Sequence, residues 1–117
     1  MKKYLLLAIT LTLSAGVLAS PNCEKLAQLA ESSASNYGDD ATATIQGKKG
    51  SRAYFYTAPS NQCKTTTFVI PKDRITLMQD IKSEGESWVY VAFSGGEVPT
   101  LTHGWMKKSN IGEVTFN

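Results

Sequence analysis

Few residues in this chain could carry nucleophilic or metal chemistry. Cys23 and Cys63 are its only thiols, and His103 is its only imidazole. A catalytic thiol needs a nearby base, and among imidazoles only His103 could serve. A structural zinc site takes four ligands at short paired spacings, which these three residues do not provide. We therefore expect no bound metal. A small enzyme that uses Cys63 or His103 stays open as the least favoured reading.

Other catalytic patterns are equally weak. Asp39 and Asp40 form a carboxylate pair, but adjacent side chains in a turn are usually solvated. No glycine-rich phosphate loop follows a predicted strand and opens a helix, and no nucleophile-elbow motif occurs. The sequence thus predicts a protein that is not an enzyme, with no catalytic residues and no cofactor.

The charge balance excludes further classes. The chain of 117 residues has 12 basic and 10 acidic side chains, and two of the basic ones are Lys2 and Lys3. Without that end the balance is zero. A nucleic-acid binder needs a basic surface that replaces phosphate counterions, so nucleic acid is not an expected partner. A polybasic membrane-surface protein is disfavoured for the same reason.

The N-terminus has the pattern of a secretory signal. Lys2-Lys3 precedes an apolar run over 4–13, and small residues precede a cleavage site after Ala19. The run is shorter than the roughly 20 apolar residues of a membrane span. We expect 1–19 to be removed and the mature chain to remain in the periplasm, without stable membrane insertion. Cys23 does not directly follow the cleavage site, so a lipid anchor is not expected.

The two cysteines predict one disulfide. In an oxidising compartment an even cysteine count favours pairing, and Cys23 and Cys63 can pair in only one way. The bond would fasten the N-terminal segment to the rest of the domain.

The periodicity of the chain changes near Gly38. Residues 22–34 show apolar residues at helical spacing, and Asn22 is a plausible N-cap. After Gly38 the chain reads as short β-prone runs separated by turn signals, which favours a small all-β barrel or sandwich. We therefore divide the chain into a signal peptide, a helical segment and a β domain, over 1–19, 20–38 and 39–117. The expected strands lie at 41–46, 52–57, 65–70, 74–81, 87–93, 100–106 and 110–116.

Three stretches in order resemble the bacterial SH3-type (SH3b) family, and a fourth, Pro71–Leu77, also fits the turn that this family has before a central strand. The three are Arg52–Ser60, Ser87–Val91 with its Trp88, and Gly104-Trp105-Met106 followed by Ile111. The likeness spans roughly residues 42 to 112 and implies an SH3-like barrel. It also implies peptidoglycan as a ligand, because SH3b domains often serve as binding modules of cell-wall hydrolases. Trp105 would be a structural residue of its strand.

Strand alternation sorts the aromatic residues between two faces. Val89, Val91 and Phe93 share one face of their strand, and with Phe55 they form the better core. The other set then points partly outward and is the candidate partner-binding surface: Tyr54, Tyr56, Trp88 and Tyr90. The alternative is that the N-terminal helix packs on these four side chains. His103 is expected at the surface or half-buried.

These observations favour a non-catalytic periplasmic binding module with a protein partner. One concrete form is an immunity or inhibitor protein that covers the active site of a toxin or wall-lytic enzyme. The alternative is a peptidoglycan-binding module, as the resemblance implies.

Overall fold

The computed structural model describes residues 22–38, 40–95 and 100–116. The predicted signal peptide and its cleavage site, Asp39, and residues 96–99 of the predicted loop lie outside this range. None of the helices in the described part of the chain is long and apolar enough to span a membrane.

The one α-helix among the described residues, α2 (Cys23–Ser33), begins where the sequence predicts. The side chain of Asn22 accepts the backbone N–H of Lys25 at 3.2 Å and so caps the first turn, as expected of an N-cap. Glu24 lies in the first turn, where its charge complements the helix dipole. Only Ala30 is buried, because the helix lies on the sheet along a narrow stripe of its surface.

The remaining described elements are strands and two single 3-10 turns. The strands are β1 (Ser35–Asn36), β2 (Ala41–Thr44), β3 (Ala53–Tyr56), β4 (Lys64–Val69), β5 (Arg74–Ser83), β6 (Glu86–Gly95), β7 (Thr100–Lys107) and β8 (Thr115–Phe116), and the 3-10 turns are η1 (Asn61–Cys63) and η2 (Lys108–Asn110).

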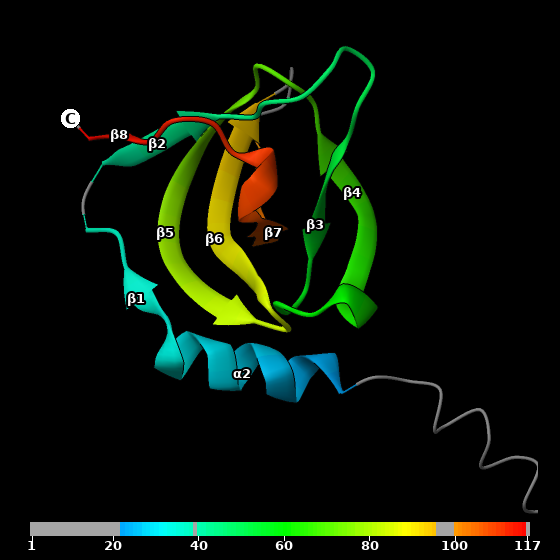
Figure 1. Ribbon diagram of the computed structural model, residues 1–117, viewed down its shortest axis with the longest axis vertical. Coiled ribbons are helices and arrows are strands. Elements are labelled where there is room, and N and C mark those ends of the chain that lie inside the picture. Colours follow the sequence, from blue (N-terminus) through cyan, green and yellow to red (C-terminus); the bar gives the residue numbers. More distant parts are fainter. Residues whose placement is uncertain (1–21, 39, 96–99, 117) are drawn as a thin grey trace, which may run out of the picture.

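The strands form one antiparallel sheet in the order β4-β3-β7-β6-β5-β2-β8, and β1 pairs with β5 beside this path. The long strands β5, β6 and β7 follow one another as a meander, and β5 and β6 curve strongly (Figure 1). The β5–β6 register shifts between Leu77 and Gln79, and such a bulge bends a strand. In the same view α2 crosses the end of the sheet where the β5–β6 hairpin turns.

The concave side of the sheet holds the main core. Val89, Val91 and Phe55 are buried there as the alternation predicts, and Phe93 packs against the cluster half-buried. The full buried cluster is Ala41, Ala43, Ile45, Ala53, Phe55, Val69, Ile75, Leu77, Val89, Val91, Met106 and Ile111.

The disulfide pairs Cys23 with Cys63, and the two Cα atoms lie 5.8 Å apart. It ties the start of α2 to the end of η1 across a sequence separation of 40 residues. The predicted pairing is confirmed. So is the prediction of a mainly β chain with one short helix before it.

Candidate functional site

The strand register places three aromatic residues in one row on the convex side of the sheet. Trp105 of β7 lies between Tyr56 of β3 and Tyr90 of β6. Trp88 lies two residues before Tyr90 and therefore on the same face of β6, as Tyr54 does relative to Tyr56 on β3. We call these five residues the aromatic layer: Tyr54, Tyr56, Trp88, Tyr90 and Trp105. All four predicted binding residues thus meet on one face, and Trp105 joins them.

Two of the predicted binding residues are not accessible. Trp88 has 0% of its surface exposed and Tyr56 has 8%, because Ala30 of α2 packs in the same buried cluster. Their rings meet edge to face with centroids 4.9 Å apart. The expectation that Trp88 and Tyr56 point partly outward is therefore wrong. The alternative, that the helix packs on this face, describes them better.

Tyr54 and Tyr90 are half-buried at opposite margins of the layer. Both rings pack against the buried cluster formed by Ala30, Tyr56, Trp88 and Trp105. The layer thus has two open margins, one beside each tyrosine, and a third margin that is closed by polar contacts.

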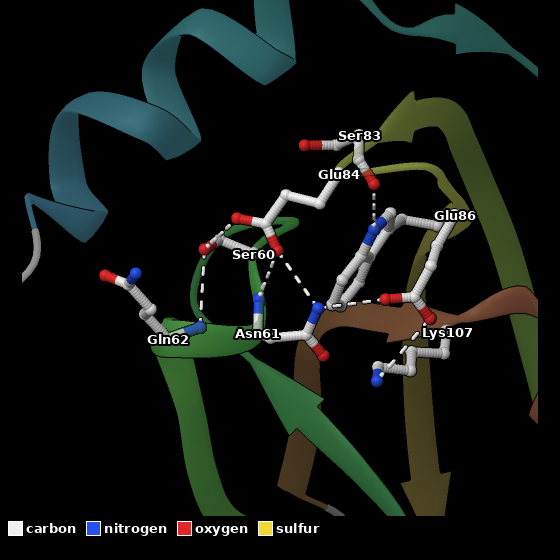
Figure 2. Close-up of polar contacts among 8 residues, drawn as sticks. Ser60, Asn61, Gln62, Ser83, Glu84, Glu86 and Lys107 are labelled. Atoms are coloured by element: carbon white, nitrogen blue, oxygen red, sulfur yellow. Dashed lines mark hydrogen bonds and ion pairs between the residues drawn. The ribbon is translucent and has the colours of Figure 1, made fainter.

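The closed margin surrounds Trp88. Its indole N–H donates to the carbonyl oxygen of Ser83 at 3.0 Å, which satisfies the one polar group of a fully buried ring. The ammonium of Lys107 lies 5.7 Å from the Trp88 ring and 3.5 Å from a carboxylate oxygen of Glu86 (Figure 2). These contacts hold the indole in place and keep it from a ligand.

Glu84 organises the rest of this margin. Glu84 and Gly85 form the two-residue turn between β5 and β6, and both have positive φ, as a type I′ turn requires. The Glu84 carboxylate accepts the Asn61 backbone N–H at 2.9 Å and the Ser60 hydroxyl at 2.7 Å (Figure 2). The hydrogen bonds from Asn61 and Ser60 lower the pKa of Glu84. The turn is thereby joined to η1 and, through Cys63, to the helix.

The first open margin is a cleft between α2 and the aromatic layer, which we call the Tyr90 cleft. It has a volume of about 250 Å³, and its lining comprises Glu24, Ala27, Gln28, Glu31, Thr57, Gln79, Tyr90 and Trp105. The Tyr90 and Trp105 rings meet edge to face at 5.3 Å. Burial and then the negative charge of Glu31 raise the pKa of Tyr90. The Tyr90 hydroxyl also hydrogen-bonds Nδ1 of His103, which is exposed as expected.

The second open margin lies on β3 and β4. Tyr54 and Phe68 face each other across the two strands, with ring centroids 5.6 Å apart in an edge-to-face arrangement. The guanidinium of Arg52 lies 4.5 Å from the Phe68 centroid, and the ammonium of Lys64 lies 4.1 Å from the Tyr54 centroid. We call these four residues the β4 strip. Its order is cation, ring, ring, cation.

Sequence reasoning missed two residues of these margins. Phe68 is 37% exposed and alternates with buried Val69, a signal that was available in the run 65–70. No local sequence pattern points to Glu84, because its role depends on Asn61, which lies 23 positions earlier in the chain.

Within 22–38, 40–95 and 100–116, no three His, Cys, Asp or Glu side chains are grouped to hold a metal ion. The two cysteines are bonded to each other, and His103 lies at the rim of the Tyr90 cleft. Comparisons with protein-family models, with curated proteins and with solved structures find no match.

Proposed function

We propose that this chain is a secreted, non-catalytic SH3-like binding module that recognises a protein partner in the periplasm. The disulfide supports an oxidising compartment. One form of this function is an immunity or inhibitor protein that covers the active site of a toxin or wall-lytic enzyme. Rescue of growth against a co-encoded toxin would identify that form.

The SH3-like part of the proposal rests on strand order. The meander of β5, β6 and β7 leads through the single turn η2 to Ile111, which pairs back with Ile45 as an isolated bridge. This is the order expected of the resemblance at Gly104-Trp105-Met106 and Ile111. Ile45 follows β2, so this bridge lies next to the strand that pairs with β5, which supports the proposed SH3-like order.

The observation that carries the proposal is the layout of the aromatic layer. Two half-buried tyrosines stand at open margins, and each packs against the buried aromatic cluster beside it. Rigid aromatic side chains with a polar tip give large contact area at low entropic cost, as partner-binding residues do.

Photo-cross-linking in the native host tests the proposal. A benzophenone amino acid at Tyr54 should give one discrete cross-linked protein, whereas the same group at the exposed Thr115 of β8 should give none. Equal cross-linking at both positions, or none at Tyr54, would contradict recognition of a protein through this face.

A second candidate, peptidoglycan binding, is favoured by the Tyr90 cleft. Its aromatic floor could contact the apolar face of a sugar ring, and Gln28, Gln79 and Glu31 offer hydrogen bonds to hydroxyl and amide groups. Co-sedimentation with purified sacculi tests this candidate. Under peptidoglycan binding, Tyr90→Ala should lose co-sedimentation while Tyr54→Ala keeps it, because the two residues occupy different margins.

A further inference from the structure

The near-zero charge of the chain conceals an uneven distribution. Residues 41–79 carry six basic side chains, and their one acidic side chain, Asp73, accepts the Ile70 backbone N–H. The rest of the described chain has four basic and seven acidic residues. The β4 strip belongs to the basic part, whereas the Tyr90 cleft is lined by Glu24 and Glu31. The two open margins therefore differ in the sign of their charge.

The cations of the β4 strip have no acidic partner in the described residues, where the only ion pair joins Lys107 to Glu86. Arg52 and Lys64 are exposed, and each lies on an aromatic ring. An aromatic ring restrains a cation without neutralising it, so both charges remain available to an anionic group.

A neighbouring cleft extends the strip. Arg52 also lines a cleft of about 410 Å³ together with Lys48, and the other lining residues are Ile45, Gln46, Gly47, Ser51, Ala53, Pro71, Ser109 and Asn110. None of these is acidic. The cleft therefore places a second cation, hydroxyls and amides beside the guanidinium of Arg52, which is a favourable setting for a carboxylate.

We propose that the β4 strip binds an acidic segment of the partner protein, with carboxylates on Arg52 and Lys64 and apolar side chains on Phe68 and Ile70. Ile70 is 49% exposed at the end of β4, beside the half-exposed Phe68. This inference rests on the proposed function and names the chemistry of the partner.

Two observations favour an acidic protein segment over other ligands. A nucleic acid base or a sugar would need an open ring face, but Lys64 lies over Tyr54 and Arg52 lies over Phe68. Pure strand addition to β4 is disfavoured as well, because the Thr67 N–H already donates to the Thr65 hydroxyl. Recognition would therefore depend on side chains and on charge.

An NMR titration of the 15N-labelled mature protein tests the inference. The probe is a six-residue peptide of alternating Glu and Leu, with the corresponding Lys-Leu peptide and a thymidine hexanucleotide as controls. We expect saturable shifts of the β4 amides with the acidic peptide alone. Binding should weaken when ionic strength rises, because screening shortens the reach of exposed charges to about 10 Å at 0.1 M salt.

The variant R52Q/K64Q replaces both cations by uncharged polar side chains that can still donate hydrogen bonds. It should bind the acidic peptide about fivefold more weakly, since each exposed charge pair contributes roughly 0.2 to 1 kcal/mol. The matched control K82Q/K108Q removes two exposed cations outside the strip and should change affinity less than about twofold. Unchanged amide spectra of the free variants verify the fold.

Three results would overturn the inference: equal shifts with the Lys-Leu peptide, an unchanged affinity in R52Q/K64Q, or tighter binding of the oligonucleotide. If the peptide titration fails but Tyr54 still gives a cross-linked protein, the partner is not acidic and the proposed function stands. If both experiments fail, the proposed function fails as well.

Discussion

The carboxylate of Glu84 accepts the backbone N–H of Asn61, 23 residues earlier in the chain, at 2.9 Å. Glu84 adopts a positive φ of 54° in a two-residue turn where Asn or Gly is the favoured residue. Glu84 is a less favourable residue for this turn, but its carboxylate accepts hydrogen bonds from Ser60 and from Asn61 at the start of η1. Glu84 thus joins the hairpin turn to a segment far away in the sequence.

Glu84 should give the protein a specific sensitivity to acid. Its hydrogen bonds lower its pKa in the folded state, so the stabilisation is present above the unfolded pKa of ~4.3 and is lost as pH falls through the folded value. Melting temperatures measured from pH 7 to pH 3 should fall less steeply for Glu84→Gln than for the unchanged protein. The exposed Glu113, changed to Gln, is the control and should leave the slope unaltered. Parallel curves for all three proteins would contradict this role.

Trp88 and Tyr54 should separate stability from binding. Trp88→Ala removes a fully buried ring and leaves the Ser83 carbonyl without its donor, so we expect a loss of about 3 to 5 kcal/mol in the free energy of unfolding. Tyr54→Ala should cost about 1 kcal/mol, because the ring is half-exposed. Urea denaturation measures both. A similar cost for the two changes would mean that Tyr54 is a core residue.

The disulfide should hold α2 on the aromatic layer. The helix buries only Ala30, and in the chain-entropy model a loop of 40 residues accounts for about 4 kcal/mol. We expect the double variant Cys23→Ser/Cys63→Ser to lose much of that free energy. Its tryptophan fluorescence should shift to longer wavelength as water reaches Trp88 and Trp105. An unshifted spectrum in the folded variant would show that packing alone seats the helix.

The hydroxyl of Tyr37 should destabilise the folded protein. The oxygen is buried and has no hydrogen bond of normal geometry in the described structure, although the carboxylate of Asp80 lies near enough to act on it and the ring packs against the inner core. Tyr37→Phe should therefore raise the free energy of unfolding by about 1 kcal/mol at neutral pH. A destabilised variant would indicate a bound partner for the hydroxyl.

Tyr37 should also make the free energy of unfolding sensitive to alkaline pH. Burial, together with the charge of the nearby Asp80, raises the pKa of Tyr37 to about 12. Because the folded pKa exceeds the unfolded value of ~10, stability is complete below pH 10 and is lost as pH rises toward 12. Tyr37→Phe should lose less stability over this interval. Thermal melts from pH 9 to 11.5 compare the two proteins.

Much of the architecture follows from local sequence patterns. The helix with its Asn22 cap, the positions of the six longer strands and the inward set around Val89 and Val91 are all consequences of periodicity and turn residues. The two-residue strand β1 was beyond such patterns, and β8 occupies only the last part of the strand predicted at 110–116. Ser35 pairs with Asp80 only because the chain after the helix passes beside β5.

The aromatic site was predictable only in part. Alternation assigns Trp88 and Tyr90 to the convex face, but it does not reveal what covers that face. The cover depends on α2, which the disulfide anchors to η1. Tyr90 stays half-exposed and Trp88 does not, a difference set by the tertiary position of one helix.

The Cys23–Cys63 bond also determines what a protease can do to this molecule. It makes residues 23–63 a covalent ring, and the exposed turn 47–51 lies inside that ring. A single cut in the turn would leave both fragments joined, so the nicked chain would migrate as one species until a reductant is added. A single cut at that turn would consequently release no part of the chain.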